Sequence, residues 1–105
     1  MRVDELETRA REVCLAFPEA IEKTTWGHPT FRVRDRIFAS FAVDEESGRA
    51  TMTMKAPPGE QEVLLAVGHP FFLPRYVGSK GWIGVVVDSG TDWSEIAELV
   101  EESYR

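Results

Sequence analysis

The sequence predicts an α+β fold, in which a mainly antiparallel sheet carries helices on one face in the order α-β-β-β-α-β-β-α. The first observation is alternation, since residues 30–34 and 49–55 alternate apolar and polar side chains as half-buried strands do. The second is a helical spacing of apolar residues near both ends of the chain. The third is that short turns join the central strands, which favours hairpins and leaves the second face of the sheet partly open.

The length of 105 residues predicts one domain, residues 1–105. The single cysteine cannot form an internal disulfide. The N-terminus is charged, and no stretch approaches the roughly 20 apolar residues of a membrane span. We therefore expect a soluble, cytoplasmic monomer with no signal peptide and no membrane partner.

Charge is distributed unevenly along the chain. The net charge of −6 argues against a simple nucleic-acid binder, because such domains are usually basic. Residues 24–56 are nevertheless net positive at +1, whereas residues 91–105 carry −4. The sequence therefore places acids on the terminal helices and cations on the sheet, a polarity that can present a basic face. Solvated helix surfaces explain the same pattern without any partner.

The first predicted element is a helix that begins near Asp4, where Asp4 and Glu7 fit a capping box, and that ends before Pro18. Cys14 lies on the apolar stripe of this helix, which predicts a buried and unreactive thiol. Residues 19–23 are predicted to form one more helical turn. The bend at residues 24–29 then leads into the sheet, with Trp26 expected as a packed anchor.

Three strands follow, at residues 30–34, 36–43 and 49–55. The middle strand is expected to bury its odd-numbered residues from Ile37 to Val43 and to turn Phe38 toward the open face. The turn after it, residues 44–49, has three consecutive acids at its tip. This middle strand is more apolar than its neighbours, which indicates a central position in the sheet.

The second half of the chain predicts a short helix at residues 60–67, which ends at Gly68. Two prolines exclude a helix between residues 69 and 77, and the later part of that segment is predicted as a strand. Residues 82–87 form a strong strand. The last helix begins near Asp92, capped together with Glu95, and runs to Tyr104.

The sequence offers little for catalysis, so we expect neither an enzyme nor a cofactor or metal site. A nucleophile would need a surface thiol beside an imidazole, but Cys14 is on an apolar stripe. Zinc needs about four ligands at short spacings, which one cysteine and two isolated histidines do not supply. A small-molecule sensor or enzyme that uses His28 is the least favoured alternative.

The open face of the sheet is the remaining candidate site. Cations that bind phosphates, next to aromatic rings that stack on bases, are typical of a nucleic-acid surface. The predicted nucleic-acid-binding residues are Arg32, Arg34, Lys55, Arg75, Lys80 and Trp82. Arginines paired with acids on neighbouring strands would make the same face an ordinary sheet surface.

Several stretches resemble one family of small bacterial proteins. These are Phe17-Pro-Glu-Ala-Ile-Glu22, Trp26-Gly-His-Pro-Thr-Phe31 and Ile37-Phe-Ala-Ser-Phe41, followed by Lys55, Tyr76, Lys80-Gly-Trp82 and the helix from Asp92 to Tyr104. Over nearly its whole length the chain is similar to the MmcQ/YjbR family.

The resemblance implies a compact α+β domain, similar in architecture to secretion chaperones, that binds DNA through a double-wing arrangement of two hairpins. The first wing would be the hairpin from Arg36 to Lys55, and the second the hairpin from Tyr76 to Val87. The acidic tip of the first wing, Asp44-Glu-Glu46, departs from that role, because phosphates are repelled there. The alternative function is a chaperone-like adaptor that binds a protein or peptide on the same face.

Overall fold

A computed structural model gives the structure of the protein and describes residues 2–105. The described residues form three α-helices, α1 (Val3–Leu15), α2 (Glu60–Val67) and α3 (Trp93–Tyr104), and a short 3-10 turn, η1, at Gly78–Lys80. The strands are β1 (Ile21–Thr25), β2 (His28–Val33), β3 (Arg36–Val43), β4 (Ala50–Lys55), β5 (Phe71–Phe72) and β6 (Trp82–Val87).

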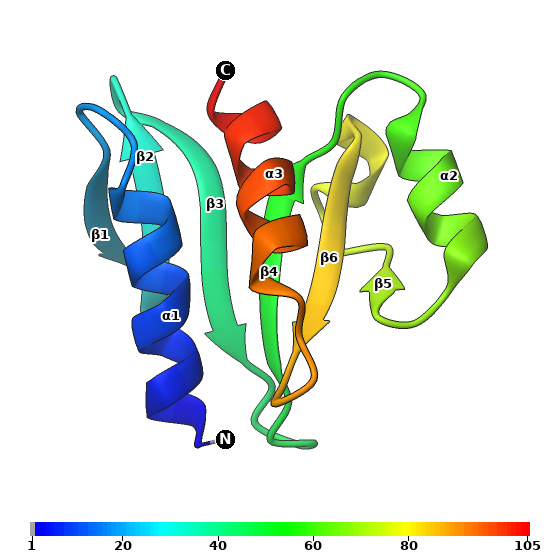
Figure 1. Ribbon diagram of the computed structural model, residues 1–105, viewed down its shortest axis with the longest axis horizontal. Helices are drawn as coiled ribbons and strands as arrows, with labels where there is room; N and C mark the ends of the chain where they lie inside the picture. The colour runs from blue at the N-terminus through cyan, green and yellow to red at the C-terminus, as the bar shows by residue number, and fades with distance from the viewer. Residues whose placement is uncertain (1) are drawn as a thin grey trace.

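The six strands form a single sheet in the order β1-β2-β3-β4-β6-β5, and every neighbouring pair is antiparallel. Helices α1 and α3 lie over one face of this sheet, and α2 lies beside β6 and β5 (Figure 1). The predicted α+β class, with helices on one face of an antiparallel sheet, is confirmed. None of the helices described is long and apolar enough to cross a membrane.

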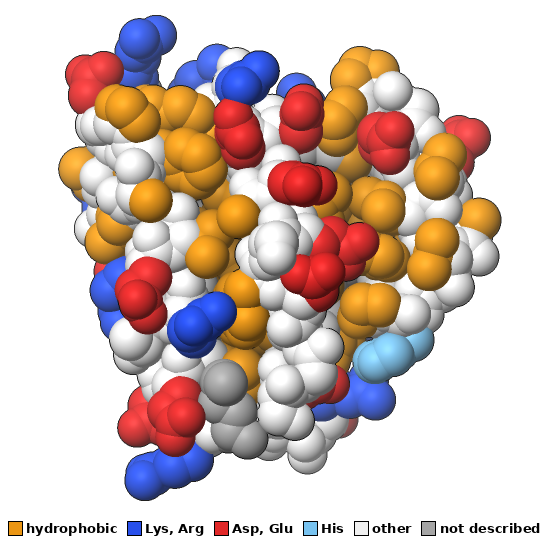
Figure 2. Space-filling model, in the orientation of Figure 1, with side chains coloured by type: hydrophobic (Ala, Val, Ile, Leu, Met, Phe, Trp, Pro, Cys, Tyr) orange, Lys and Arg blue, Asp and Glu red, His pale blue; other side chains and the backbone are white. Residues whose placement is uncertain are grey.

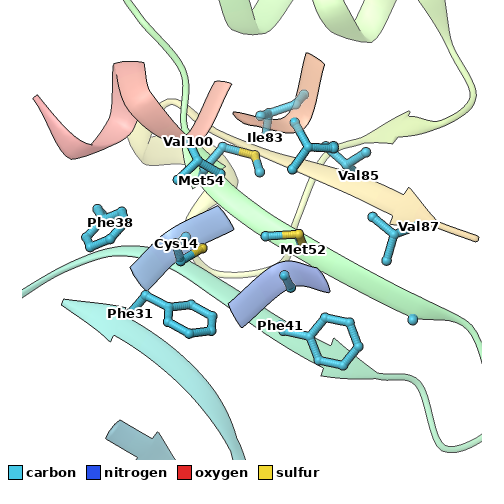
Figure 3. Packing of buried hydrophobic residues seen from close by; sticks show 14 of the residues in the cluster. Cys14, Phe31, Phe38, Phe41, Met52, Met54, Ile83, Val85, Val87 and Val100 are labelled. Atoms are coloured by element: carbon cyan, nitrogen blue, oxygen red, sulfur yellow. The ribbon is translucent and has the colours of Figure 1, made fainter. Parts of the chain in front are cut away.

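The core lies between the sheet and the pair α1 and α3 (Figure 3). Alternate residues of the central strands supply it: Phe41, Met52, Met54 and Val85 are each at most 1% exposed. Cys14 on α1 is fully buried among them, as predicted. Burial raises the pKa of its thiol to about 12, so the thiol stays protonated and unreactive near neutral pH.

The two long helices begin differently. The carboxylate of Asp92 accepts hydrogen bonds from the backbone N–H groups of Ser94 and Glu95, which confirms Asp92 as the N-cap of α3 but not the reciprocal bond predicted for the Glu95 side chain. Helix α1 starts two residues earlier than predicted, with Arg2 as its N-cap, and among residues 2–105 no side chain caps it. The predicted capping box of Asp4 and Glu7 is therefore wrong, because Asp4 is already inside the first turn.

A strand replaces the helical turn that was predicted at residues 19–23. Strand β1 pairs with β2 along its whole length, from Ile21 opposite Arg32 to Thr25 opposite His28. Its sequence contains three β-branched residues, Ile21, Thr24 and Thr25, which suits an edge strand better than a helix. The sheet consequently extends one strand further at its N-terminal edge.

A β-bulge interrupts the pairing of β2 with β3. Arg32 lies opposite Ile37, but the preceding residue, Phe31, lies opposite Ala39, so Phe38 is an extra residue in β3. A bulge of this kind changes which face the side chains reach on one side of it. Phe38 and Ala39 are accordingly both buried.

The bulge overturns the predicted orientation of Phe38. Its ring lies on the helix side, with ring centroids 6.2 Å from Phe17 and 5.4 Å from Tyr104 of α3. Ile37, which was predicted to face the core, lines the open face instead. Alternation read from the sequence cannot detect such an inserted residue, because it shifts the period without changing composition.

The segment between β5 and β6 also differs from the prediction. Its strand is the early part, Phe71–Phe72, and the later part is a loop that leads into η1. Tyr76 in this loop has a left-handed backbone with φ of 65°. The second wing predicted from Tyr76 to Val87 is therefore not a hairpin, because it contains only one strand.

Candidate functional site

The two layers of the molecule carry opposite charge. Helices α1, α2 and α3 contain ten acidic residues against two basic ones, Arg9 and Arg11. The strands contain four basic residues, Lys23, Arg32, Arg36 and Lys55, against one acid. Figure 2 shows acidic side chains gathered over α3 and α2 on the helix side.

A groove of about 660 Å³ lies on the open face of the sheet. Small side chains of β3 and β4 form its floor, the β1–β2 hairpin borders it on one side, and the segment before β6 borders it on the other. The groove is mostly apolar. It is lined by Trp26, His28, Thr30, Ile37, Ser40, Ala42, Thr51, Thr53, Phe72, Pro74, Arg75, Tyr76, Val77 and Trp82.

Hydroxyl groups on the floor of the groove bind one another. The hydroxyls of Ser40 and Thr53 lie 2.6 Å apart across β3 and β4. The Thr30 hydroxyl donates to the Lys23 carbonyl at 2.9 Å and lies 3.2 Å from the Thr25 hydroxyl. These short polar side chains keep the floor low and supply hydrogen-bonding groups without charge.

Arg32 lies on the open face as predicted, but its guanidinium is held by neighbours. It donates to the hydroxyls of Thr25 and Thr30 and lies 3.5 Å from the carboxylate of Asp35. Its side chain is only 18% exposed. Arg32 therefore supports the floor of the sheet more than it offers a free cation.

Four exposed cations from three segments of the chain lie at one end of the sheet, and we call this group the basic edge. Its members are Arg34, Arg36, Lys55 and Lys80. The register explains the grouping, because β2 ends and β3 begins at this end, and Lys55 at the end of β4 pairs with Trp82 at the start of β6. Within residues 2–105, none of the four takes part in an ion pair. Arg34 and Arg36 also line a smaller pocket of about 260 Å³ with Tyr104 and Arg105.

Arg36 was not among the predicted site residues. Arg36 is the first residue of its strand, and the alternation of that strand did not assign its side chain to either face. The sequence did show that Arg36 directly follows the tight turn at Arg34 and Asp35. Both turn residues have positive φ, 51° and 65°, so β2 and β3 are joined by a two-residue hairpin. That hairpin brings Arg34 and Arg36 to the same edge.

Arg75 lies in the groove, toward the opposite end of the sheet from the basic edge. The pKa of the Asp44 carboxyl is lowered mainly by the hydrogen bond from Ser47, with a smaller contribution from the charge of Arg75. Asp44 belongs to the acidic β3–β4 turn. The acidic tip therefore faces the far end of the open face, away from the basic edge.

Two exposed aromatic residues border the groove, and sequence reasoning missed both. Trp26 was predicted to be a packed anchor, yet it is 91% exposed in the turn between β1 and β2. Tyr76 is also 91% exposed. Trp82 is half-buried, less exposed than either of them, and lines the groove from the open-face side of β6. The sequence signal was the Trp-Gly pair, which occupies a turn and not a packed segment.

The histidines do not assemble into a site. His28 lines the groove, whereas His69 lines a different pocket of about 300 Å³ near Asp44 and Arg49. Over residues 2–105 there is no group of three or more His, Cys, Asp and Glu side chains placed to hold a metal ion. What the site offers chemically is therefore stacking, hydrogen bonding and phosphate attraction.

Two solved structures share this architecture. A protein from Deinococcus radiodurans with the family-model domain DUF419 superposes with a TM-score of 0.76 at 23% sequence identity, covering 98% of this chain and 75% of that one. A Pseudomonas syringae protein gives a TM-score of 0.68 at 14% identity over 99% of this chain and 97% of that one. At these identities the similarity shows the fold alone.

Sequence comparison identifies the family. No functionally curated protein matches the chain. A family model described as YjbR matches residues 15–105, which include the whole sheet and its groove. The chain therefore belongs to the YjbR family.

Proposed function

We propose that this YjbR-family protein binds DNA through the open face of its sheet, with the basic edge on the phosphates. The observation that supports the proposal is the set of four exposed cations that form no ion pair with any residue from 2 to 105, next to a groove bordered by aromatic side chains. Phosphate contacts of this kind supply most of the affinity of proteins for DNA.

The negative net charge does not exclude this function, because ten of the 18 acidic residues are in the helices. Eight of these ten are in α1 and α3, which lie over one face of the sheet, whereas the groove is lined by residues of the other face. Exposed charges more than about 10 Å apart are largely screened at ordinary salt. A polarised molecule can thus attract a polyanion to one face while the other repels it.

Of the six residues predicted from sequence, Arg34, Lys55 and Lys80 are proposed to bind phosphates directly, with Arg36 added. Arg75 and Trp82 line the groove and are proposed to contact the nucleotides that enter it. Arg32 is proposed to orient the floor, since its donors are already engaged by Thr25 and Thr30.

A salt titration tests the proposal. Binding of a fluorescent duplex of about 20 base pairs is followed by anisotropy between about 50 and 200 mM salt. With four phosphate contacts, the slope of log K against log salt is expected near −3.6, at about −0.9 for each contact. Absence of any binding at about 50 mM salt and about 10⁻⁴ M protein would refute it, because even nonspecific DNA affinity is measurable there.

The apolar lining of the groove favours a second candidate, an adaptor that binds an extended peptide. The groove offers a flat floor and aromatic walls, which suit alternate side chains of a strand-like segment. Salt separates the two functions. Peptide binding driven by apolar contact is expected to change little over the salt range that weakens DNA binding.

A further inference from the structure

Two aromatic residues that line the groove have an unfavourable backbone conformation. Trp26 has φ of 52° and Tyr76 has φ of 65°, which is the left-handed region that bulky residues rarely adopt. Each such conformation costs of order 1 kcal/mol or more. Because both rings are 91% exposed, burial of the rings does not compensate for that cost. Strained residues of this kind cluster at ligand sites.

The positive φ of Trp26 belongs to a turn of a defined type. Thr25 pairs with His28, and both residues between them have positive φ, 52° for Trp26 and 82° for Gly27. This is the two-residue hairpin turn whose first position favours Asn, Asp or Gly. A tryptophan in that position stabilises neither the turn nor the core, but it projects an indole ring at the border of the groove.

Trp26 and Tyr76 stand on opposite sides of the groove. Trp26 belongs to the β1–β2 hairpin, on one side of the floor formed by β3 and β4. Tyr76 belongs to the segment between β5 and β6, on the other side. On this second side the Phe72 ring packs over Gly84, where a Cβ would approach within 2.4 Å of that ring.

The lining and the size of the groove indicate what fits between these rings. It is mostly apolar and holds uncharged hydroxyls on its floor. An unpaired nucleobase has apolar ring faces for stacking and polar edges for hydroxyl groups. The volume of about 660 Å³ is that of a small-molecule site. Bases paired in a duplex are covered by their stacked neighbours and cannot place their ring faces on Trp26 and Tyr76, whereas unpaired bases can.

We propose that the groove is a subsite for unpaired bases of single-stranded DNA, stacked against Trp26 and Tyr76. The DNA strand leaves the groove at the basic edge, whose cations bind its phosphates. The acidic turn at the other end of the sheet repels phosphates and so favours this path. This inference rests on the proposed DNA binding and specifies which form of DNA the groove accepts.

The test compares two ligands and three variants. Anisotropy is measured for a labelled oligo-dT of about 12 nucleotides, a length within known single-strand site sizes, and for a duplex of the same length. Trp26→Asn and Tyr76→Asn remove the rings and place there a residue that tolerates positive φ, so the fold is retained. Val67→Asn, at a 64% exposed position on α2, is the control for loss of exposed apolar surface.

The wild-type protein is expected to bind oligo-dT more tightly than duplex. Each aromatic substitution is expected to weaken oligo-dT binding by at least about fivefold, the lower end of the range for one stacked base. Duplex affinity and the Val67→Asn control are expected to stay within about twofold of wild type.

The outcomes separate the inference from the function on which it rests. If the protein binds duplex with a steep salt slope but the two aromatic variants bind oligo-dT like wild type, the base subsite is wrong and DNA binding stands. If neither DNA form binds, both are wrong. If an extended peptide of alternating Val and Ser binds instead, with the same sensitivity to Trp26→Asn and Tyr76→Asn, the groove is a peptide site and the inference is overturned.

Discussion

The two faces of the sheet differ in the size and polarity of their side chains, although residues that are neighbours in the sequence form both faces. On β4, Met52 and Met54 are fully buried beneath the helices, while Thr51 and Thr53 between them line the open groove. The helix side is filled with large apolar side chains, and the open side is floored by small hydroxyl residues. The comparison teaches that stability is concentrated on one face, which leaves the other free to be shaped for a ligand.

The largest contrast between the faces is expected in stability. Phe41→Ala, at a position 1% exposed, is expected to lower the free energy of unfolding by about 3–5 kcal/mol, through lost apolar contact and a cavity. Thr51→Ala, on the groove side of the neighbouring strand, is expected to cost less than about 1 kcal/mol. Urea unfolding measures both. If Phe41→Ala does not fold, Phe41→Leu replaces it, and equal costs on the two faces would contradict the contrast.

The next largest effect concerns DNA affinity. Arg36→Gln together with Lys55→Gln is expected to reduce the salt slope on duplex DNA by about 1.8 in magnitude and to weaken binding roughly 30-fold, or about 2 kcal/mol. The matched control is Arg2→Gln together with Arg9→Gln, which removes two cations from the helix side. If the control weakens binding equally, net charge alone governs affinity and the basic edge has no special role.

Removal of the ion pair between Arg11 and Glu22, on the helix side, is expected to have a smaller effect on stability and none on DNA binding. Arg11 binds both carboxylate oxygens of Glu22, at 2.6 and 3.0 Å, and these hydrogen bonds lower the pKa of Glu22 from 4.5. Glu22→Gln is expected to cost about 1 kcal/mol at pH 7, a moderate value because the pair is only part-buried. Thermal unfolding measures the cost.

The pH dependence of this pair has a definite sign. A carboxyl whose pKa is lowered by folding contributes its stability above the unfolded value of 4.5 and loses it as pH falls through the folded value. The wild-type protein should therefore lose more stability than Glu22→Gln between neutral pH and pH values below 4.5. An equal loss in both proteins would show that the pair is not formed.

The smallest expected effect comes from the acidic turn. Glu45→Gln together with Glu46→Gln is expected to tighten DNA binding about twofold, because these exposed like charges are remote from the basic edge and screened by salt. The free energy of unfolding should change by less than about 0.5 kcal/mol, as for other exposed substitutions. Anisotropy against the same duplex measures the change. Tightening of tenfold or more would place the strand over this turn and not over the basic edge.

The sequence predicted the features that depend on local periodicity. The strand at residues 82–87, the helix at 60–67 and the cap at Asp92 all match the structure, since each is encoded within about ten neighbouring residues. The buried state of Cys14 followed from its helical stripe in the same way.

What the sequence did not predict depends on pairing between segments. The strand β1 is too polar to be recognised alone and is defined by its hydrogen bonds to β2. The extra residue in β3 becomes visible only when β3 is set against β2. For the same reason the exposed position of Trp26 was missed, because its turn exists only once β1 is known to be a strand. The groove, which needs both edges of the sheet, was therefore predicted only as an open face.

Mapping of amide chemical shifts by NMR tests the central claim most directly. Addition of unlabelled oligo-dT to the isotope-labelled protein is expected to shift the amides of the groove floor, Ser40, Thr51 and Thr53, and that of Arg36 on the basic edge. The amides of the first two turns of α3, residues 93–99, should remain in place, because only the end of this helix, at Ser103 and Tyr104, lies beside the basic edge. Shifts confined to the helix side, or none at about 10⁻⁴ M protein and low salt, would contradict the assignment of DNA binding to the open face.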